Sequence, residues 1–514
     1  MAYPLLYEIN TRCWLRDLSS RQGRAVSLAN IPASEFADWR RLGLTHIWLM
    51  GVWSSGPRAR ARALTDPLLR AIYAKVLPAW QDQDVAGSPY AIGDYQVPAE
   101  LGGEAGLKSF RERLNAEGMK LVLDFVPNHL GVDHPWVWER PDLFVRATGS
   151  KPETFRQSTA GGAIWLAHGK DPYFPAWSDT VQLDYRRAST RKAMTDLLMS
   201  VAGCCDGLRC DMAMLLLNDV FAKTWEGFPS TEAPPVEEFW GTAIAAIKRV
   251  HPSFLFLAEA YWGLEERLVT LGFDYAYDKA LYDKLQGRQP VAVTRHLLDL
   301  GPEKLATGAH FLENHDEPRI ASLMSFAEER ASALVVLGLP GMRLLHEGQL
   351  TGARVKVPVQ LTRRAQEPVD SEIQSLYDQL LTTLHSREQR SCEILLARPA
   401  WPGNPTAQNF VLLQRQSHGL EFDLLVVNLA PHRSQCYAPV RIPDCPSENW
   451  HMKDLLGPER YVRFRGDLQA HGLYLDLPAH GAQLFRFEPV GGKSEISKSE
   501  MRENSKEQSP VGGG

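Results

Sequence analysis

The sequence predicts an α/β fold: a (β/α)8, or TIM, barrel with an irregular insertion after its third strand and a C-terminal antiparallel β-sandwich. Three observations carry this prediction. Apolar strand-like segments alternate with amphipathic helices over residues 1–390, which is typical of a parallel sheet covered by helices on both faces. Helical periodicity is lost between residues 130 and 184. After residue 390 short β-like segments replace the helices.

These changes in pattern divide the 514-residue chain into five segments. We expect residues 1–129 and 185–390 to form the barrel in two parts, with residues 130–184 as the insertion. Residues 391–490 contain "FVLLQR", "FDLLVVNL", "GLYLDLP" and "AQLFRF", which indicate a separate sandwich. Residues 491–514 have few apolar side chains, so we expect a disordered tail.

Eight segments have the length and apolar content of buried strands. They lie near residues 6–14, 46–53, 119–125, 203–211, 254–260, 273–277, 308–314 and 342–346. Between the second and third, Leu107, Phe110 and Leu114 have helical spacing, and Gly118 ends that helix. Eight such units indicate a closed barrel. A doubly wound open sheet is the alternative, but it usually has a Gly-rich turn after its first strand, where this chain reads "YEINTRCW".

Composition and charge exclude several classes of function. A net charge of −5 provides no electrostatic reason to expect nucleic acid or an anionic membrane as a partner. Seven cysteines, an odd number without C-x-x-C spacing, argue against a disulfide framework and a structural zinc site. No apolar run is long enough for a membrane helix, and "MAYPLLYEIN" does not resemble a signal peptide. We therefore expect a cytoplasmic protein, and its oligomeric state stays open.

Four of the predicted strands end in polar groups that packing does not require. In a barrel the carboxyl ends of the strands face one shared pocket. The groups, in chain order, are Asp124, Asn128 and His129 at the end of the third strand, Arg209 and Asp211 at the end of the fourth, Glu259 at the end of the fifth, and His315 and Asp316 at the end of the seventh. Together these residues predict an active site.

Three carboxylates at separate strand ends allow a division of labour. Arg209 and Asp211 are two residues apart and face the same side of a strand, so the guanidinium is expected to lower the pKa of Asp211 and keep a nucleophile ionised. Glu259 follows "FLFLA" and precedes Tyr261 and Trp262, an apolar setting that raises a carboxyl pKa and suits a general acid. Such a pair is what retaining glycoside hydrolysis requires. A further carboxylate, Asp316, is placed to bind sugar hydroxyls and stabilise positive charge.

The motifs at the four strand ends resemble those of a known family. "DFVPNH", "GLRCD", "FLAEA" and "ENHD" are similar in order and spacing to the four signature stretches of the α-amylase family, glycoside hydrolase family 13, and "SPYAIGDY" resembles its Tyr-bearing stretch after strand two. The resemblance spans nearly all of residues 1–490. It implies Asp211 as nucleophile, Glu259 as acid/base and Asp316 as transition-state stabiliser. It implies a substrate subsite lined by Tyr90, His129, Arg209 and His315, to which we add Trp262 because it follows the acid/base.

The chain also departs from the family pattern. Met214 and Leu215 stand where many members have Lys-His, and Ala91 replaces a frequent Asp. These positions touch the acceptor and donor subsites, so the resemblance does not extend to substrate or linkage. Many members bind calcium beside the insertion through the Asn of the first motif, here Asn128. Because "MAMLLLNDV" is apolar at the adjoining position, we expect activity without calcium and no other cofactor.

The motif "RARAR", with Arg58, Arg60 and Arg62, is a candidate phosphate site. No Gly-rich cradle accompanies it, so a solvated loop is the expectation.

The predicted function is a retaining α-glycoside hydrolase or transglycosidase acting on α-glucans or their oligosaccharides. We expect the insertion to form one wall of the cleft, its aromatic side chains stacking on sugar rings or forming the lobe's own core. One alternative is a barrel metal hydrolase with ligands among Asp124, His129, His315 and Asp316, although such sites usually need a His pair at the first strand. The other is an inactive carbohydrate-binding protein on the same fold, against which the complete carboxylate set argues.

Overall fold

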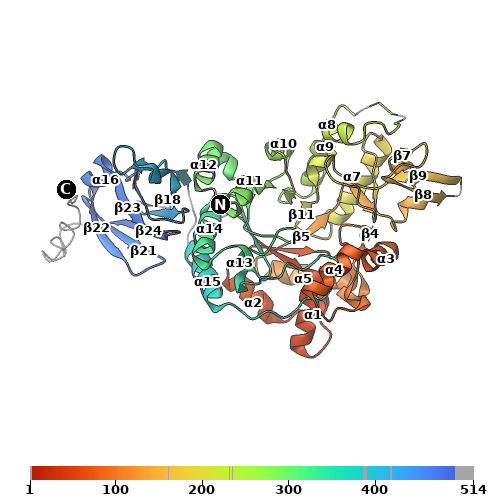
Figure 1. Ribbon diagram of the computed structural model, residues 1–514, viewed down its shortest axis with the longest axis horizontal. Helices are drawn as coiled ribbons and strands as arrows, with labels where there is room; N and C mark the ends of the chain where they lie inside the picture. The colour runs from red at the N-terminus through yellow and green to blue at the C-terminus, as the bar shows by residue number, and fades with distance from the viewer. Residues whose placement is uncertain are drawn as a thin grey trace.

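A computed structural model describes residues 3–159, 161–230, 232–233, 235–385, 391–416 and 419–491. The predicted disordered tail lies outside the described residues, apart from Gly491. In Figure 1 the barrel lies at the centre, with the insertion on its right and the sandwich on its left.

Eight parallel strands form a closed barrel, which confirms the predicted fold class. They are β1 (Leu5–Asn10), β2 (His46–Met50), β5 (Lys120–Phe125), β11 (Gly207–Cys210), β12 (Leu255–Ala258), β13 (Tyr275–Tyr277), β14 (Gly308–His310) and β15 (Met342–His346). Each strand pairs with its neighbours in chain order, and β15 closes the barrel against β1. The open doubly wound sheet is therefore excluded.

Several strands are shorter than the sequence predicted, because their last residues leave the sheet. The first predicted strand, 6–14, is wrong at its end: helix α1 (Thr11–Gln22) begins directly after β1, and the Asn10 side chain caps it by accepting from the Cys13 N–H. Likewise β14 ends at His310, so "ENHD" lies in the loop that follows.

Helices cover the outside of the barrel. The main ones are α1, α2 (Ala33–Arg41), α5 (Gly103–Ala116), α7 (Ala188–Ala202), α9 (Phe239–Val250), α11 (Lys279–Gln286), α12 (Pro290–Leu305), α14 (Phe326–Gly338) and α15 (Ser371–His385). Shorter helices follow individual strands: α8 (Asn218–Thr224), α10 (Glu265–Thr270) and α13 (Ile320–Leu323). In α5 the predicted face, Leu107, Phe110 and Leu114, is buried, and Gly118 takes a positive φ just beyond its end.

The loop after β2 carries two helices that the sequence did not predict. They are α3 (Pro57–Thr65) and α4 (Pro67–Val76), framed by the short strands β3 (Ser54–Ser55) and β4 (Ile92–Asp94). The expectation that "RARAR" forms a solvated loop is wrong, because Pro57 starts α3 and the three arginines lie on this helix.

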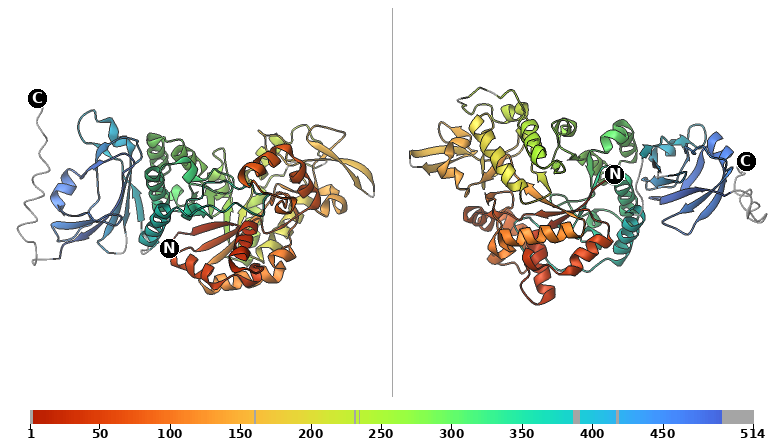
Figure 2. Two further views of the ribbon diagram at one scale, coloured as in Figure 1. Left: turned by 60° about the horizontal axis from the view of Figure 1, so that its bottom comes forward. Right: turned by 180° about the vertical axis from the view of Figure 1, so that it is seen from behind.

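The insertion after β5 is a small β-rich lobe. Strand β6 (His129–Gly131) enters it and pairs antiparallel with β10 (Thr180–Gln182), through which the chain returns. Between them lie helix α6 (Trp136–Glu139) and a three-stranded sheet of β7 (Arg146–Ala147), β9 (Gly162–Ala167) and β8 (Thr154–Thr159). Both views in Figure 2 place this lobe at the end of the molecule opposite the sandwich.

The C-terminal region is an antiparallel sandwich. Its larger sheet has the order β16 (Ser391–Ile394), β18 (Phe410–Gln416), β19 (Phe422–Asn428), β24 (Ala482–Pro489), β21 (Asn449–Asp454) and β22 (Arg460–Phe464). The smaller sheet contains β17 (Arg398–Pro399), β20 (Ser434–Ala438) and β23 (Leu473–Leu477), and helix α16 (Arg465–Ala470) joins the two. The central strands β18 and β19 of the larger sheet are buried on both faces: Leu424 belongs to the sandwich core, whereas Leu425 belongs to the barrel's core cluster.

Candidate active site

The carboxyl ends of β5, β11 and β12 meet around one buried cation. Arg209 on β11 is fully buried, and its Nη1 lies 2.7 Å from Oδ1 of Asp211 and 3.6 Å from Oδ1 of Asp124. Its Nη2 lies 2.7 Å from Oε2 of Glu259. In the parallel register of β11 and β5, Arg209 lies beside Asp124. Because β12 pairs with β11 on its other side, three adjacent strands bring these groups together. The predicted convergence of Arg209, Asp211 and Glu259 is therefore present.

Glu259 is held on both of its oxygens. The Met212 N–H donates to Oε2 and the Tyr261 hydroxyl donates to Oε1, each at 2.7 Å. Met212 adopts a φ of 43°, so the chain turns sharply after Asp211 and aims this N–H at Glu259. Sequence reasoning placed Tyr261 only as an apolar neighbour and missed its hydrogen bond.

The predicted pKa of Asp211 is wrong in direction. Burial and the neighbouring Glu259 carboxylate raise the pKa of Asp211 from 3.8 to about 8, and these effects outweigh the lowering by Arg209. Burial likewise raises the pKa of Asp124 to about 6. One guanidinium cannot neutralise three buried carboxylates, so the cluster retains a proton near neutral pH.

His315 and Asp316 lie in the loop after β14, where His315 contacts both Asp316 and Tyr90. The His315 Nε2 lies 2.8 Å from the Tyr90 hydroxyl and 2.9 Å from Oδ2 of Asp316, and the Tyr90 and His315 rings stack at 5.2 Å. Although burial opposes it, the charge of His315 holds the pKa of Asp316 below its usual range. Asp316 is therefore ionised, with half of its side chain exposed.

Glu8 on β1 is a site residue that the sequence did not reveal. It is fully buried, and its Oε1 contacts Nδ1 of His315 at 2.5 Å. Burial alone would lower the pKa of His315, but the carboxylates of Asp316 and Glu8 raise it well above its ordinary value. No local pattern could indicate this contact, because 307 residues separate the partners.

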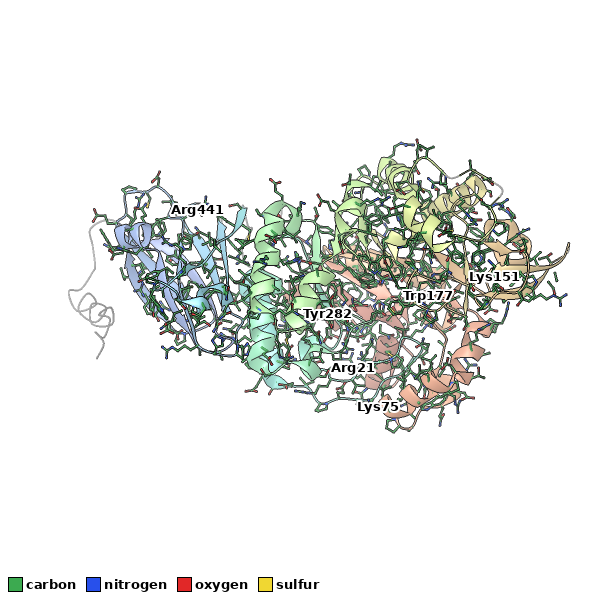
Figure 3. The ribbon with its side chains drawn as sticks, turned by 45° about the horizontal axis from the view of Figure 1, so that its top comes forward. Arg21, Lys75, Lys151, Trp177, Tyr282 and Arg441 are labelled. Carbon is green, nitrogen blue, oxygen red and sulfur yellow. The ribbon has the colours of Figure 1, made fainter. Side chains whose placement is uncertain are left out.

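His129 lies at the entrance to the insertion. Its Nε2 is 3.1 Å from the Tyr90 carbonyl oxygen, and its ring packs on Trp177 with centroids 5.0 Å apart. Burial lowers the pKa of His129 to about 4, so the imidazole is neutral. Figure 3 shows Trp177 near the barrel and Lys151 further out in the insertion.

Trp262 lies in the loop after β12 and meets the insertion. It adopts a φ of 66°, keeps 41% of its surface exposed, and packs edge-on against Tyr173 at 5.0 Å. Tyr173 is itself 61% exposed and Phe174 is 69% exposed. The side chain of Asp171 accepts from both of their N–H groups and fixes this turn. The sequence argument named the tryptophans of the insertion and missed this exposed pair.

The residues proposed as metal ligands are occupied by other partners. In the part of the chain that the structure describes, no three His, Cys, Asp or Glu side chains are grouped as a metal site. Asp124 faces Arg209, while His315 binds Glu8 and Asp316. These contacts leave the barrel metal hydrolase without structural support.

Fold and site together define a (β/α)8 barrel in which carboxylates at the strand ends surround one arginine. The family model for the α-amylase catalytic domain matches residues 38–389, more than half of the chain. The chain therefore belongs to the α-amylase family.

Individual relatives are distant. α-Amylase MalA of Haloarcula japonica is 24% identical over 325 residues, 61% of this chain and 43% of that protein. Glucan 1,6-α-glucosidase of Streptococcus dysgalactiae subsp. equisimilis is 22% identical over 381 residues, 66% of this chain and 63% of that protein. This chain thus spans less than two thirds of either relative.

A solved structure shows the same fold. The noncanonic maltogenic α-amylase AmyB from Thermotoga neapolitana is 19% identical, with a TM-score of 0.66 covering 95% of this chain and 99% of that one. Among the described helices, none has both the length and the apolarity needed to span a membrane.

Proposed function

We propose that this protein is a retaining α-glycoside hydrolase or transglycosidase acting on α-glucans or their oligosaccharides. The observation that carries the proposal is the pairing of Asp211 and Glu259 with the two terminal nitrogens of Arg209. Two carboxylates held side by side can act as nucleophile and as acid/base on one glycosidic bond. The relatives named as an α-amylase and a 1,6-α-glucosidase support an α-glucan substrate.

The reaction would proceed in two displacements. Asp211 attacks the anomeric carbon while Glu259 donates its proton to the glycosidic oxygen, so the aglycone leaves and a glycosyl-enzyme forms. Glu259 then removes a proton from water or from a sugar hydroxyl, which displaces Asp211. This cycle requires one proton in the Asp211–Glu259 pair, located on Glu259 when substrate binds.

The surrounding residues would bind the attacked sugar. Asp316, ionised and half exposed, accepts from sugar hydroxyls and stabilises the positive charge of the transition state. Tyr90, His129, Arg209 and His315 line the same subsite, and Trp262 offers an aromatic face on the acceptor side.

Two variants test the carboxylate roles. Asp211→Asn and Glu259→Gln should each lower kcat on maltooligosaccharides by a factor on the order of 10⁴ without unfolding the protein. Retention of a tenth of wild-type activity in either variant would contradict the assignment. A wild-type protein that binds oligosaccharides without turnover would favour the inactive binding protein.

Products distinguish hydrolysis from transfer. Maltooligosaccharides of defined length are incubated with the protein and separated by chromatography. Shorter products alone indicate hydrolysis, and additional longer ones indicate transfer, an activity named in the maltosyltransferase relative of Pseudomonas aeruginosa, 26% identical over 199 residues. Proton NMR of the first product should show the α anomer, and β product would exclude retention.

We also propose that activity does not depend on calcium. The family resemblance would place Asn128 at such a site, but the Gln182 Nε2 group donates to the Asn128 carbonyl (2.8 Å), the Asn128 Oδ1 (3.0 Å) and the Leu183 carbonyl (3.1 Å). An amide donor thus lies where three oxygens converge, which does not fit a cation. Dialysis against a strong chelator should leave melting temperature and rate unchanged. A loss of both that calcium restores would refute this.

The proposed compartment is the cytoplasm. All seven cysteines are free thiols, as reducing conditions favour, and Cys13, Cys205, Cys210 and Cys436 are buried. Fractionation of the source cells, with a cytoplasmic and an exported marker, tests this; recovery with the exported marker would contradict it.

A further inference from the structure

A second cavity lies beside the barrel on the side of β1 and β2. It has a volume of about 720 Å³ and is bounded by α1, α3 and the loop that connects β2 to α5. The side chains of Arg12, Arg16 and Arg60 all line it, together with Ser54 and Ser55. None of these five residues belongs to the carboxylate site around Arg209.

The cations in this cavity exceed the anions. Arg12 donates to the Trp53 carbonyl, and Arg60 donates to the carbonyls of Val85 and Asp82. The main-chain oxygens that accept these hydrogen bonds carry no net charge, and the exposed carboxylate of Glu100 acts on the charge of Arg12. Arg16 differs, because it lies 3.2 Å from the carboxylate of Asp84.

The remaining acidic groups do not restore the balance. Asp84 lies outside the cavity lining and is shared between Arg16 and Arg363, and the only carboxylate that lines the cavity within the described residues is Glu100, which is exposed. The net charge of the side chains around the cavity is therefore close to two positive charges. Burial also lowers the pKa of the Arg12 guanidinium, which is the usual effect on a cation that has lost solvent.

One donor of the Arg12 guanidinium has no acceptor. The Nη1 of Arg12 is buried and makes no hydrogen bond to any described residue. A buried charged nitrogen without an acceptor is costly, and native proteins usually supply a partner for it. Turning the Arg12 side chain into the cavity would bring this donor to a ligand oxygen.

We propose that the cavity binds a phosphorylated small molecule. A phosphate monoester carries close to two negative charges and three acceptor oxygens, which match the net positive charge around Arg12 and Arg60. The volume is in the range of small-molecule pockets and leaves room for an organic group as large as a sugar. The absence of a Gly-rich cradle around "RARAR" does not exclude this, because guanidinium groups from α1 and α3 replace main-chain N–H donors.

Calorimetric titration at constant ionic strength tests the proposal. Glucose 6-phosphate is the probe, with inorganic phosphate to show the part of the affinity due to the phosphate group and glucose to show the part due to the sugar. We expect saturable binding of one glucose 6-phosphate per chain, weaker binding of phosphate and none of glucose in this cavity. No saturable binding of either phosphate compound at 20 mM would overturn the proposal.

Variants locate the site. Arg60→Gln and Arg12→Gln should each weaken binding of glucose 6-phosphate at least tenfold, while Arg62→Gln, on the same helix as Arg60 but outside the cavity, should not. Arg12→Gln removes the hydrogen bond to the Trp53 carbonyl, and this loss can prevent folding. In that case Arg60→Gln and the charge-preserving Arg12→Lys test the proposal. Unchanged affinity in Arg60→Gln, with the same melting temperature as wild type, would overturn the proposal.

Discussion

At the scale of single residues, one arginine side chain contacts three carboxylates of the site. Arg209 contacts Asp124, Asp211 and Glu259 and also lies over the rings of Trp48, Tyr90 and Tyr277. Removing a single partner from a buried charge cluster typically costs 3–5 kcal/mol, because the remaining charges lose their compensation. The free protein therefore keeps a proton in the cluster, and the proposed reaction requires this proton on Glu259 when substrate binds.

The first residue-scale prediction concerns Glu8. Glu8→Gln keeps the shape of the side chain but removes one of the two carboxylates that raise the pKa of His315. The pKa of His315 should fall, so the imidazolium that accompanies Asp316 is lost at lower pH. We expect a drop of about tenfold in kcat and an alkaline limb of the pH–rate profile that moves to lower pH.

Glu117→Gln, on the surface, is the matched control for Glu8→Gln. If Glu8→Gln lowered the melting temperature while the pH profile kept its shape, Glu8 would be a structural residue only.

The second residue-scale prediction concerns stability and pH. The pKa of Asp211 is 3.8 in the unfolded chain and about 8 in the folded protein, so between these values the folded state binds the extra proton. Its stabilising effect is complete below about pH 4 and is lost as pH rises through 8. Asp211→Asn carries no such proton and should be more stable than wild type at pH 8.5, by on the order of 1 kcal/mol, and the gain should shrink towards pH 4.

Melting temperatures across this pH range measure the effect of Asp211→Asn, with Asp196→Asn, exposed on α7, as control. A gain that does not depend on pH would mean that the charge of Asp211 is not its source.

At the scale of elements, the loops after the strands form the rim of the candidate site. The loop after β12 and the insertion after β5 meet where Trp262 contacts Tyr173, and these residues keep 41% and 61% of their surface exposed. By contrast, Trp136 and Trp177 pack against the barrel core cluster. The insertion thus contains exposed aromatic side chains, which are free to stack on sugar rings, and partly buried ones that pack against the core. The sequence analysis left both roles open.

The element-scale prediction follows from this exposure. Trp262→Ala and Tyr173→Ala should each raise KM for maltooligosaccharides several-fold and leave the melting temperature nearly unchanged, because little buried surface is lost. The control is Trp401→Ala, which is 49% exposed in the sandwich. A lower melting temperature with an unaltered KM would show that the pair serves the packing of the lobe.

At the scale of the whole molecule, the sandwich is part of the barrel's core. Val411, Leu413, Leu425 and Val427 from β18 and β19 join the same buried cluster as the barrel helices, and Gly338 at the end of α14 leaves room for Leu425. Continuous burial of this kind couples two domains, because neither can unfold without exposing the other.

The whole-molecule prediction compares adjacent residues. Leu425→Ala weakens the contact with the barrel and Leu424→Ala weakens the sandwich core, and each should cost about 2–5 kcal/mol. Calorimetry should show one melting transition in the wild type and in both variants. Two separate transitions in Leu424→Ala would show that the sandwich unfolds on its own.

The sequence by itself determined the barrel and the identity of the central acids, because both follow from local patterns. Eight apolar runs define the strands, and the spacing of Arg209 and Asp211 puts both side chains on one face. The same local rules missed α3, whose start depends on Pro57, and extended the first strand into α1.

Only the tertiary structure decided the electrostatics of the site. The contact between Glu8 and His315, the Tyr261 hydroxyl on Glu259 and the raised pKa of Asp211 all depend on groups that folding brings together or on the water it removes. Sequence spacing reports which neighbours lie on one strand, whereas a pKa sums the burial and every charge around the group. That sum reversed the predicted direction for Asp211 although its arginine partner was identified correctly.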